Sequence, residues 1–98
     1  MVTFSANLGF LWADLPLPSA ILAAKAAGFD AVECHWPYAT PSTEITAALK
    51  GTGLEMLGLN TPKSAGGIGQ FGLCALSGQE TLARAVIDQS LDFADEIG

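Results

Sequence analysis

A helix end and a complete strand adjoin in the stretch Gly28-Phe29-Asp30-Ala31-Val32-Glu33-Cys34-His35-Trp36-Pro37. Glycine commonly follows the last residue of a helix because it accepts the left-handed conformation there. Proline stops a strand because it has no N–H to donate to a sheet. Residues 30–36 are therefore predicted to form a strand that starts directly after a helix ending near residue 27.

The same strand-then-helix pattern occurs three times along the chain. The predicted strands span residues 3–8, 30–36 and 54–60, and helix signals follow each of them. An order of this kind, with each strand followed by a helix, predicts a parallel sheet with right-handed crossovers.

The helix signals differ from one unit to the next. The first helix is predicted over residues 19–27. Thr40-Pro41 offers the second a hydroxyl N-cap and a proline at its first position, and Gly51 or Gly53 ends it. Ser77-Gly78-Gln79-Glu80 has the spacing of a capping box and opens a third helix with an apolar side up to Ile97.

Three such units predict part of a closed parallel barrel. A (β/α)8 TIM barrel needs about 200 or more residues, whereas this chain has 98. Half of the residues are hydrophobic, 14% are charged and the mean hydropathy is +0.40, which is apolar for a small domain with much surface in water. We therefore expect residues 1–98 to be the N-terminal part of one barrel domain, its first three βα units, with the barrel incomplete in this chain.

Charge and composition exclude several classes of protein. The net charge is −6, and the four basic residues form no stripe, so binding to nucleic acid is not expected. No apolar run is long enough to span a bilayer, and the first residues lack the basic region of a signal peptide. The two cysteines, Cys34 and Cys74, follow no metal-binding spacing, which favours reduced thiols in a cytoplasmic protein.

Side chains alternate between the two faces of a strand, so each predicted strand has an apolar and a more polar face. The apolar faces are Phe4, Ala6 and Leu8; Val32, Cys34 and Trp36; and Leu57 and Leu59. The opposite faces are Ser5 and Asn7; Ala31, Glu33 and His35; and Met56, Gly58 and Asn60. Polarity rises toward the carboxyl ends, where TIM barrels carry their active sites.

The candidate substrate-binding residues lie at these strand ends. Asn7, His35 and Asn60 are predicted to line the barrel mouth, with Glu33 one layer deeper. Alternative roles are a buried structural carboxylate for Glu33, a packed wall histidine for His35 and loop capping for the two asparagines. Glu33 and His35 are two metal-type ligands, too few to define a metal site.

Two further residues complete the candidate set. Trp36 could wall a small polar substrate or pack under a loop. Lys63, just after the third strand, could meet a substrate carboxylate or remain a solvated surface lysine.

The following stretch, Gly67-Ile68-Gly69-Gln70-Phe71-Gly72, matches G-x-G-x-x-G but lacks the strand before it and the helix after it that a dinucleotide site requires. Residues 63–76 are predicted to be a flexible loop over the mouth.

Several separated motifs resemble the hydroxypyruvate isomerase family of xylose-isomerase-like barrels. The resemblance runs in register from about residue 2 to residue 98, through Phe4-Ser5-Ala6-Asn7-Leu8, Ala27-Gly28-Phe29-Asp30-Ala31-Val32-Glu33, Trp36-Pro37-Tyr38, Leu59-Asn60-Thr61-Pro62 and Gly72-Leu73-Cys74-Ala75-Leu76-Ser77-Gly78-Gln79-Glu80. It implies a (β/α)8 barrel that converts hydroxypyruvate to tartronate semialdehyde through an enediol, in the aldose–ketose isomerases of carbohydrate metabolism.

The resemblance also implies that the catalytic glutamates, and the ligands of any Mg²⁺ or Mn²⁺ in the complete barrel, lie on later strands. No catalytic or metal-binding residue then falls in this segment, which would be inactive alone. The family usually carries Gly-Glu-Arg-Gly where Gly69-Gln70-Phe71-Gly72 stands here, so the substrate stays open among hydroxypyruvate, a 2-oxo-tetronate and other sugars or sugar acids. The alternative is a non-catalytic half-barrel. The expected partner is a second copy of this chain, through self-association, or the rest of the barrel. Metal-dependent DNA-repair nucleases share the architecture, but the acidic balance disfavours them.

Overall fold

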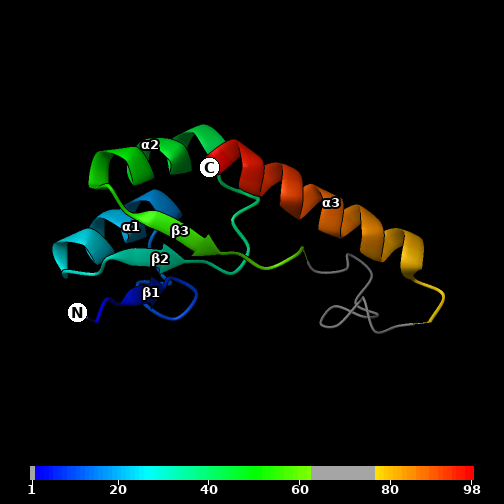
Figure 1. Cartoon of the computed structure of the whole chain (residues 1–98), viewed down its shortest axis with the longest axis horizontal. Helices are drawn as coiled ribbons and strands as arrows, with labels where there is room; N and C mark the ends of the chain where they lie inside the picture. The colour runs from blue at the N-terminus through cyan, green and yellow to red at the C-terminus, as the bar shows by residue number, and fades with distance from the viewer. Residues whose placement is uncertain (1, 63–76) are drawn as a thin grey trace.

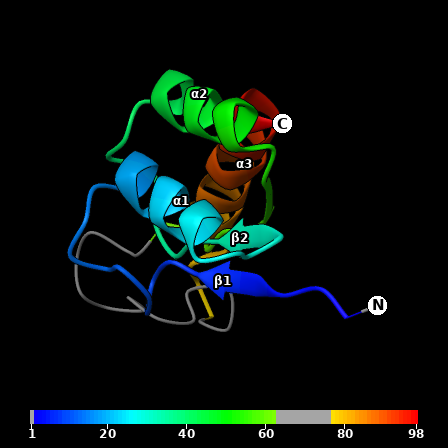
Figure 2. The same ribbon diagram turned by 90° about the vertical axis from the view of Figure 1, so that its left-hand side faces the viewer.

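A computed structural model of the chain describes residues 2–62 and 77–98. Its elements are β1 (Ser5–Asn7), α1 (Leu17–Ala26), β2 (Ala31–Glu33), α2 (Ser42–Thr52), β3 (Glu55–Gly58) and α3 (Glu80–Ile97). The strands form one parallel sheet in the order β1-β2-β3. The three helices lie on the same side of the sheet (Figures 1 and 2). The predicted parallel βα architecture is confirmed.

The core lies between the sheet and its helices. Val32 of β2, Ile21 of α1 and Ile45 of α2 are completely buried and meet in one apolar cluster. Burying a side chain of this size stabilises a fold by about 1.5–3 kcal/mol. Ala6 and Leu8 join the cluster from the first unit, and Ile97 joins it from the end of α3. Four residues of the predicted apolar faces of β1 and β2 are therefore buried as expected, namely Ala6, Leu8, Val32 and Cys34. The prediction is wrong at the two ends of these faces, where Phe4 is 65% and Trp36 40% exposed.

Each strand is shorter than predicted, but its chain stays paired beyond the regular ladder. The Leu8 N–H donates to the Glu33 carbonyl at 2.8 Å, and the Cys34 N–H donates to the Gly58 carbonyl at 3.0 Å. Further out, the Asn60 N–H donates to the His35 carbonyl at 2.7 Å. These bonds extend the order of the sheet into the segments that carry the candidate site residues.

The predicted faces of β3 are wrong at two positions. Val32 is in register with Met56, whereas the next residue, Glu33, is in register with Gly58, so Leu57 is an extra residue in a bulge. A bulge resets the alternation of side chains. Met56 therefore packs against the core and Leu57 is 58% exposed, the reverse of the prediction, while Leu59 and Gly58 keep their predicted faces.

The helix ends were predicted better than the helix starts. Gly28 follows the C-cap of α1 with φ of +95°, and Gly53 ends α2 in the left-handed conformation with φ of +74°. The start of α2 is one residue later than predicted, because the Pro41 carbonyl accepts the first bonds of the helix, from the Glu44 N–H at 3.0 Å and the Ile45 N–H at 3.4 Å.

The predicted capping box before α3 is wrong. Gln79 occupies the N-cap position and no side chain caps the helix. Gly78 has φ of +82° and turns the chain between Ser77 and the helix. The Glu80 carboxylate instead accepts a hydrogen bond from the Gly78 N–H at 3.2 Å.

Two predictions concern residues that the structure does not describe. Lys63 and the glycine-rich stretch predicted to cover the mouth both lie outside the described residues. Among the helices that are described, none combines the length and the apolar composition required to cross a membrane.

Candidate functional site at the carboxyl ends of the strands

The structure brings three of the predicted site residues to one end of the sheet. Asn7 of β1 and Glu33 of β2 are register partners, and Glu33 is paired in turn with Gly58 of β3. His35 and Asn60 follow two residues after Glu33 and Gly58, and their main chains are hydrogen-bonded. Asn7 therefore lies level with Glu33, one layer deeper than predicted, and His35 and Asn60 form the layer further out.

Asn7 has the loop-capping role that was one of its predicted alternatives. Its side-chain Oδ1 accepts a hydrogen bond from the Gly9 N–H at 2.9 Å. Its main-chain carbonyl accepts bonds from the Phe10 and Leu11 N–H groups at 3.1 and 2.9 Å. Because Oδ1 is held by the loop, the Nδ2 amide group is the donor arm that Asn7 can offer to a substrate oxygen.

The His35 ring lies directly against the backbone of Gly9. A Cβ atom added at Gly9 would lie 2.2 Å from two atoms of the imidazole ring, far inside van der Waals contact. The ring also meets Phe10 edge-on, with centroids 4.9 Å apart at 89°, and Trp36 at 5.3 Å and 65°. The imidazole is thus positioned by the loop after β1 and by its own neighbour.

Gly9 was not singled out from the sequence, although it immediately follows the first predicted strand. A glycine at a strand end can mark a close approach of the backbone to another group. The sequence does not say which group approaches, because His35 lies 26 positions further along the chain.

Side chains of the segment after β2 are hydrogen-bonded to the main chain of the segment after β3, which contains Asn60. The Trp36 indole N–H donates to the Thr61 carbonyl at 3.1 Å, and the Tyr38 hydroxyl donates to the Asn60 carbonyl. Trp36 remains 40% exposed, so its ring both anchors the neighbouring segment and forms part of the wall. Tyr38 is a second residue that the predicted site set did not contain.

The described residues offer no group of side chains suited to a metal ion. Within residues 2–62 and 77–98, no three His, Cys, Asp or Glu side chains are grouped so that they could hold a metal ion. Glu33 and His35 are two ligands from one strand and its extension, with no third beside them in that part of the chain.

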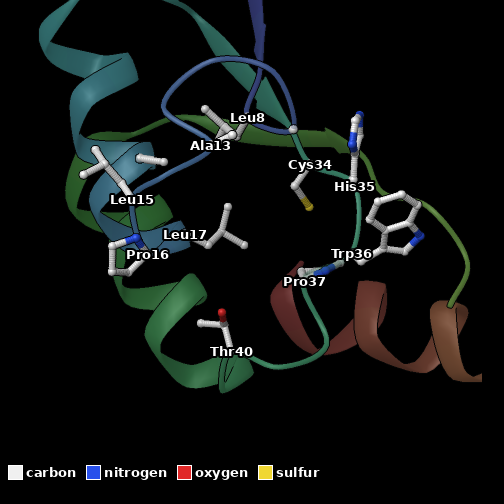
Figure 3. A pocket seen from close by; sticks show the side chains of 12 residues that line it. Leu8, Ala13, Leu15, Pro16, Leu17, Cys34, His35, Trp36, Pro37 and Thr40 are labelled. Atoms are coloured by element: carbon white, nitrogen blue, oxygen red, sulfur yellow. The ribbon is translucent and has the colours of Figure 1, made fainter. Parts of the chain in front are cut away.

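A cavity lies beside the mouth, between the loops that follow β1 and β2. It has a volume of about 390 Å³, and its wall includes Leu8, Leu17, Ala20, Cys34 and Thr40 as well as His35 and Trp36. Figure 3 labels Leu8, Leu17, Cys34, His35, Trp36 and Thr40 around the opening. Leu8 and Cys34 belong to the strand faces that turn toward the helices, so this cavity reaches toward the core and lies behind the polar layer of Asn7 and Glu33.

Cys34 is expected to be an unreactive thiol. It is buried and free, and burial raises the pKa of its thiol to about 11. The thiolate is the nucleophile, so at pH 8 alkylation should be about 100-fold slower than that of an exposed cysteine. Mass spectrometry of a Cys74→Ser variant treated with iodoacetamide measures Cys34 alone. Equal rates in the folded and the guanidinium-unfolded chain would contradict the expectation.

The chain is similar to known proteins in sequence and in fold. No family model matches the sequence. The chain is 38% identical over 96 residues to a protein of Xenopus laevis named as a hydroxypyruvate isomerase, covering 97% of the chain and 35% of that protein. It is 36% identical over 98 residues to the 2-oxo-tetronate isomerase of Haemophilus influenzae, covering 100% of the chain and 38% of that protein.

A solved structure extends the comparison to the fold. The crystal structure of an AP endonuclease, family 2, from Brucella melitensis matches 99% of the chain with a TM-score of 0.88 and 31% sequence identity. The chain covers 38% of that protein, and it spans little more than a third of the length of the two sequence relatives. The three βα units are thus a fragment of a TIM barrel, as predicted.

Proposed function

Because the chain is homologous over its whole length to hydroxypyruvate isomerases and 2-oxo-tetronate isomerases, we propose that it forms part of the pocket wall of an isomerase for small hydroxy-keto acids. The observation that carries the proposal is the convergence of Asn7, His35 and Asn60 at the carboxyl ends of three parallel strands. In a TIM barrel the active site lies at this end.

The proposed reaction converts hydroxypyruvate to tartronate semialdehyde through an enediol. A base removes a proton from the carbon that bears the hydroxyl, and the carbonyl oxygen takes up a proton, which gives the enediol. The former hydroxyl oxygen then loses its proton and becomes the aldehyde oxygen, while an acid returns a proton to the former carbonyl carbon. Such proton transfers need a positioned base and acid. We assign these groups, and the ligands of any Mg²⁺ or Mn²⁺, to parts of the complete barrel beyond this chain.

The residues of this chain would bind and orient the substrate. The Nδ2 group of Asn7 and the His35 imidazole can donate hydrogen bonds to hydroxyl, carbonyl or carboxylate oxygens. The Trp36 ring offers an apolar wall beside them. A 2-oxo-tetronate is the alternative substrate, since one relative is named for it. Lys63 is proposed as a contact for the substrate carboxylate.

The likeness to an AP endonuclease does not lead us to propose DNA as the substrate. With four basic residues against ten acidic ones, this chain could neutralise few phosphates, and phosphate contacts supply most of the affinity for DNA. We propose instead a cytoplasmic enzyme of carbohydrate metabolism, in which this segment associates with the rest of the barrel or with a second copy of itself.

A segment exchange tests the function. The chain alone should convert neither hydroxypyruvate nor a 2-oxo-tetronate faster than buffer does. Placed in the Haemophilus influenzae isomerase instead of the homologous segment, it should support turnover. His35→Gln in that chimaera should lower kcat/KM by about 10- to 100-fold, because a substrate-binding donor is displaced.

Leu22→Gln is the matched control, because Leu22 is an exposed residue of α1 that does not line the cavity beside the mouth. An inactive but folded chimaera would refute the pocket-wall assignment. Turnover by the 98-residue chain that is abolished by Glu33→Gln would instead show that the catalytic groups lie in this segment.

A further inference from the structure

Within the described residues, three hydrogen bonds join the segment after β2 to the segment after β3. The His35 carbonyl accepts from the Asn60 N–H at 2.7 Å, the Tyr38 hydroxyl donates to the Asn60 carbonyl, and the Trp36 indole donates to the Thr61 carbonyl at 3.1 Å. Two of the three bonds hold the peptide groups on either side of the Asn60 Cα atom. With both peptide planes held, the direction of the Cα–Cβ bond is set, and only the side-chain torsions of Asn60 remain free.

Tyr38 is itself held from the far side by α3. Its hydroxyl lies 2.9 Å from the Oγ atom of Ser90, a residue 52 positions away, and its ring meets Phe93 edge-on at 5.2 Å. Ser90 is buried, and its hydroxyl can also donate to the Val86 carbonyl at 2.8 Å. Since a carbonyl only accepts, the Tyr38 proton goes to Asn60, and the Ser90 proton is shared between Tyr38 and Val86.

We propose that Tyr38 is a positioning residue whose hydroxyl, supported by Ser90 of α3, fixes the backbone of Asn60 and thereby aims the Asn60 side chain at the barrel mouth. The positioning follows from the contacts alone. Its consequence for substrate binding rests on the proposed function. In this arrangement α3, which contributes no residue to the mouth itself, determines where a residue of the mouth lies.

The chemistry of the phenol suits this role. Burial raises the pKa of Tyr38, the hydrogen bond with Ser90 opposes that rise, and Cys34 adds to it. Because the pKa is raised, the hydroxyl stays protonated and keeps donating to Asn60 at neutral and mildly alkaline pH. The stabilisation from this group is present below the ordinary pKa of a tyrosine and is lost as the pH rises through the higher value of the folded chain.

Hydrogen exchange of the full 98-residue chain tests the positioning directly. Tyr38→Phe keeps the ring and removes the hydroxyl, and we expect the Asn60 amide to exchange about tenfold faster relative to the Gly53 amide, as for the loss of one hydrogen bond. The Gly53 amide, bonded to the Leu49 carbonyl at 2.9 Å, reports general destabilisation. An unchanged ratio would overturn the proposal.

The matched control is Thr46→Val, which removes a hydroxyl that donates within α2 to the Ser42 carbonyl at 2.8 Å. It should leave the Asn60 ratio unchanged.

If Tyr38→Phe fails to fold, Ser90→Ala is the second variant. Tyr38 is the chain's single tyrosine, so an ultraviolet titration reports its ionisation alone. Loss of the Ser90 bond should raise the Tyr38 pKa further, and an unchanged or lowered value would overturn the link to α3.

Kinetics of the isomerase chimaera test whether the positioning of Asn60 by Tyr38 matters for substrate binding. There, Tyr38→Phe should raise KM by about tenfold with kcat changed less than about twofold, because a displaced binding group weakens ground and transition states alike. Mere destabilisation would lower the amount of active enzyme and leave KM unchanged, and that result would overturn the role in binding. If the unmutated chimaera is inactive, the proposed function fails, whereas the exchange ratio still decides the role of Tyr38.

Discussion

The purified 98-residue chain is expected to sediment as dimers or larger species, with no stable monomer of 10.1 kDa. All three helices cover the same side of the sheet (Figure 2), and β1 and β3 are edge strands in the described part of the chain. Unpaired strand edges recruit other chains, and contiguous exposed apolar surface does the same.

Two apolar surfaces drive the expected association. Leu57, in the bulge of β3, is 58% exposed and lies outside the core cluster. On α3, Leu82, Ile87 and Leu91 remain exposed beside a buried stripe of the same helix. Each exposed leucine that becomes covered stabilises an assembly by up to about 1.5–3 kcal/mol, so several together can decide the oligomeric state.

Leu57→Asp should shift the sedimentation profile toward the monomer, since a carboxylate is costly to bury in an apolar contact. Leu22→Asp is the control, because Leu22 is nearly equally exposed, at 56%, but lies on α1. A monomer that melts sharply and cooperatively would show that the 98 residues complete their own core, which would remove the reason for a partner.

Gly9→Ala is expected to displace the His35 ring. The added methyl group would lie 2.2–2.4 Å from three ring atoms, including the Cγ atom near the base of the side chain, so the ring cannot avoid it by a small rotation of its tip. We expect a loss of about 1–3 kcal/mol in the free energy of unfolding, the usual cost of overpacking. In the chimaera kcat/KM should fall by about 10- to 100-fold, as for a misplaced binding group.

Two controls isolate the contact. Gly51→Ala introduces the same methyl group inside α2, where nothing lies within 4 Å, and should stabilise the helix by about 0.5–1 kcal/mol. Denaturant unfolding of Gly9→Ala in a His35→Ala background completes a double-mutant cycle. The cost of Gly9→Ala should largely vanish there. An equal cost in both backgrounds would show that the close approach to His35 is not its cause.

The candidate site was predictable in position but not in its contacts. Asn7, His35 and Asn60 could be placed at one edge because parallel strands bring their carboxyl ends together, whatever their exact lengths. The partners of these residues could not be foreseen. Gly9 and Tyr38 are ordinary loop residues in the sequence, and their importance depends on atoms that approach from other segments.

The order of apolar, polar, glycine and proline residues was sufficient by itself for the three βα units and for the parallel sheet. It also gave the helix end at Gly28 and narrowed the next one to Gly51 or Gly53, of which the structure has Gly53. These features depend on local conformation and on a periodicity of two, which act over a few neighbouring residues. Only the tertiary structure decided that a bulge reverses Met56 and Leu57, and that Ser90 supports Tyr38 from 52 positions away. Strand register and the contact between the Tyr38 and Ser90 hydroxyls depend on how separate elements pack together. No local sequence pattern encodes that packing.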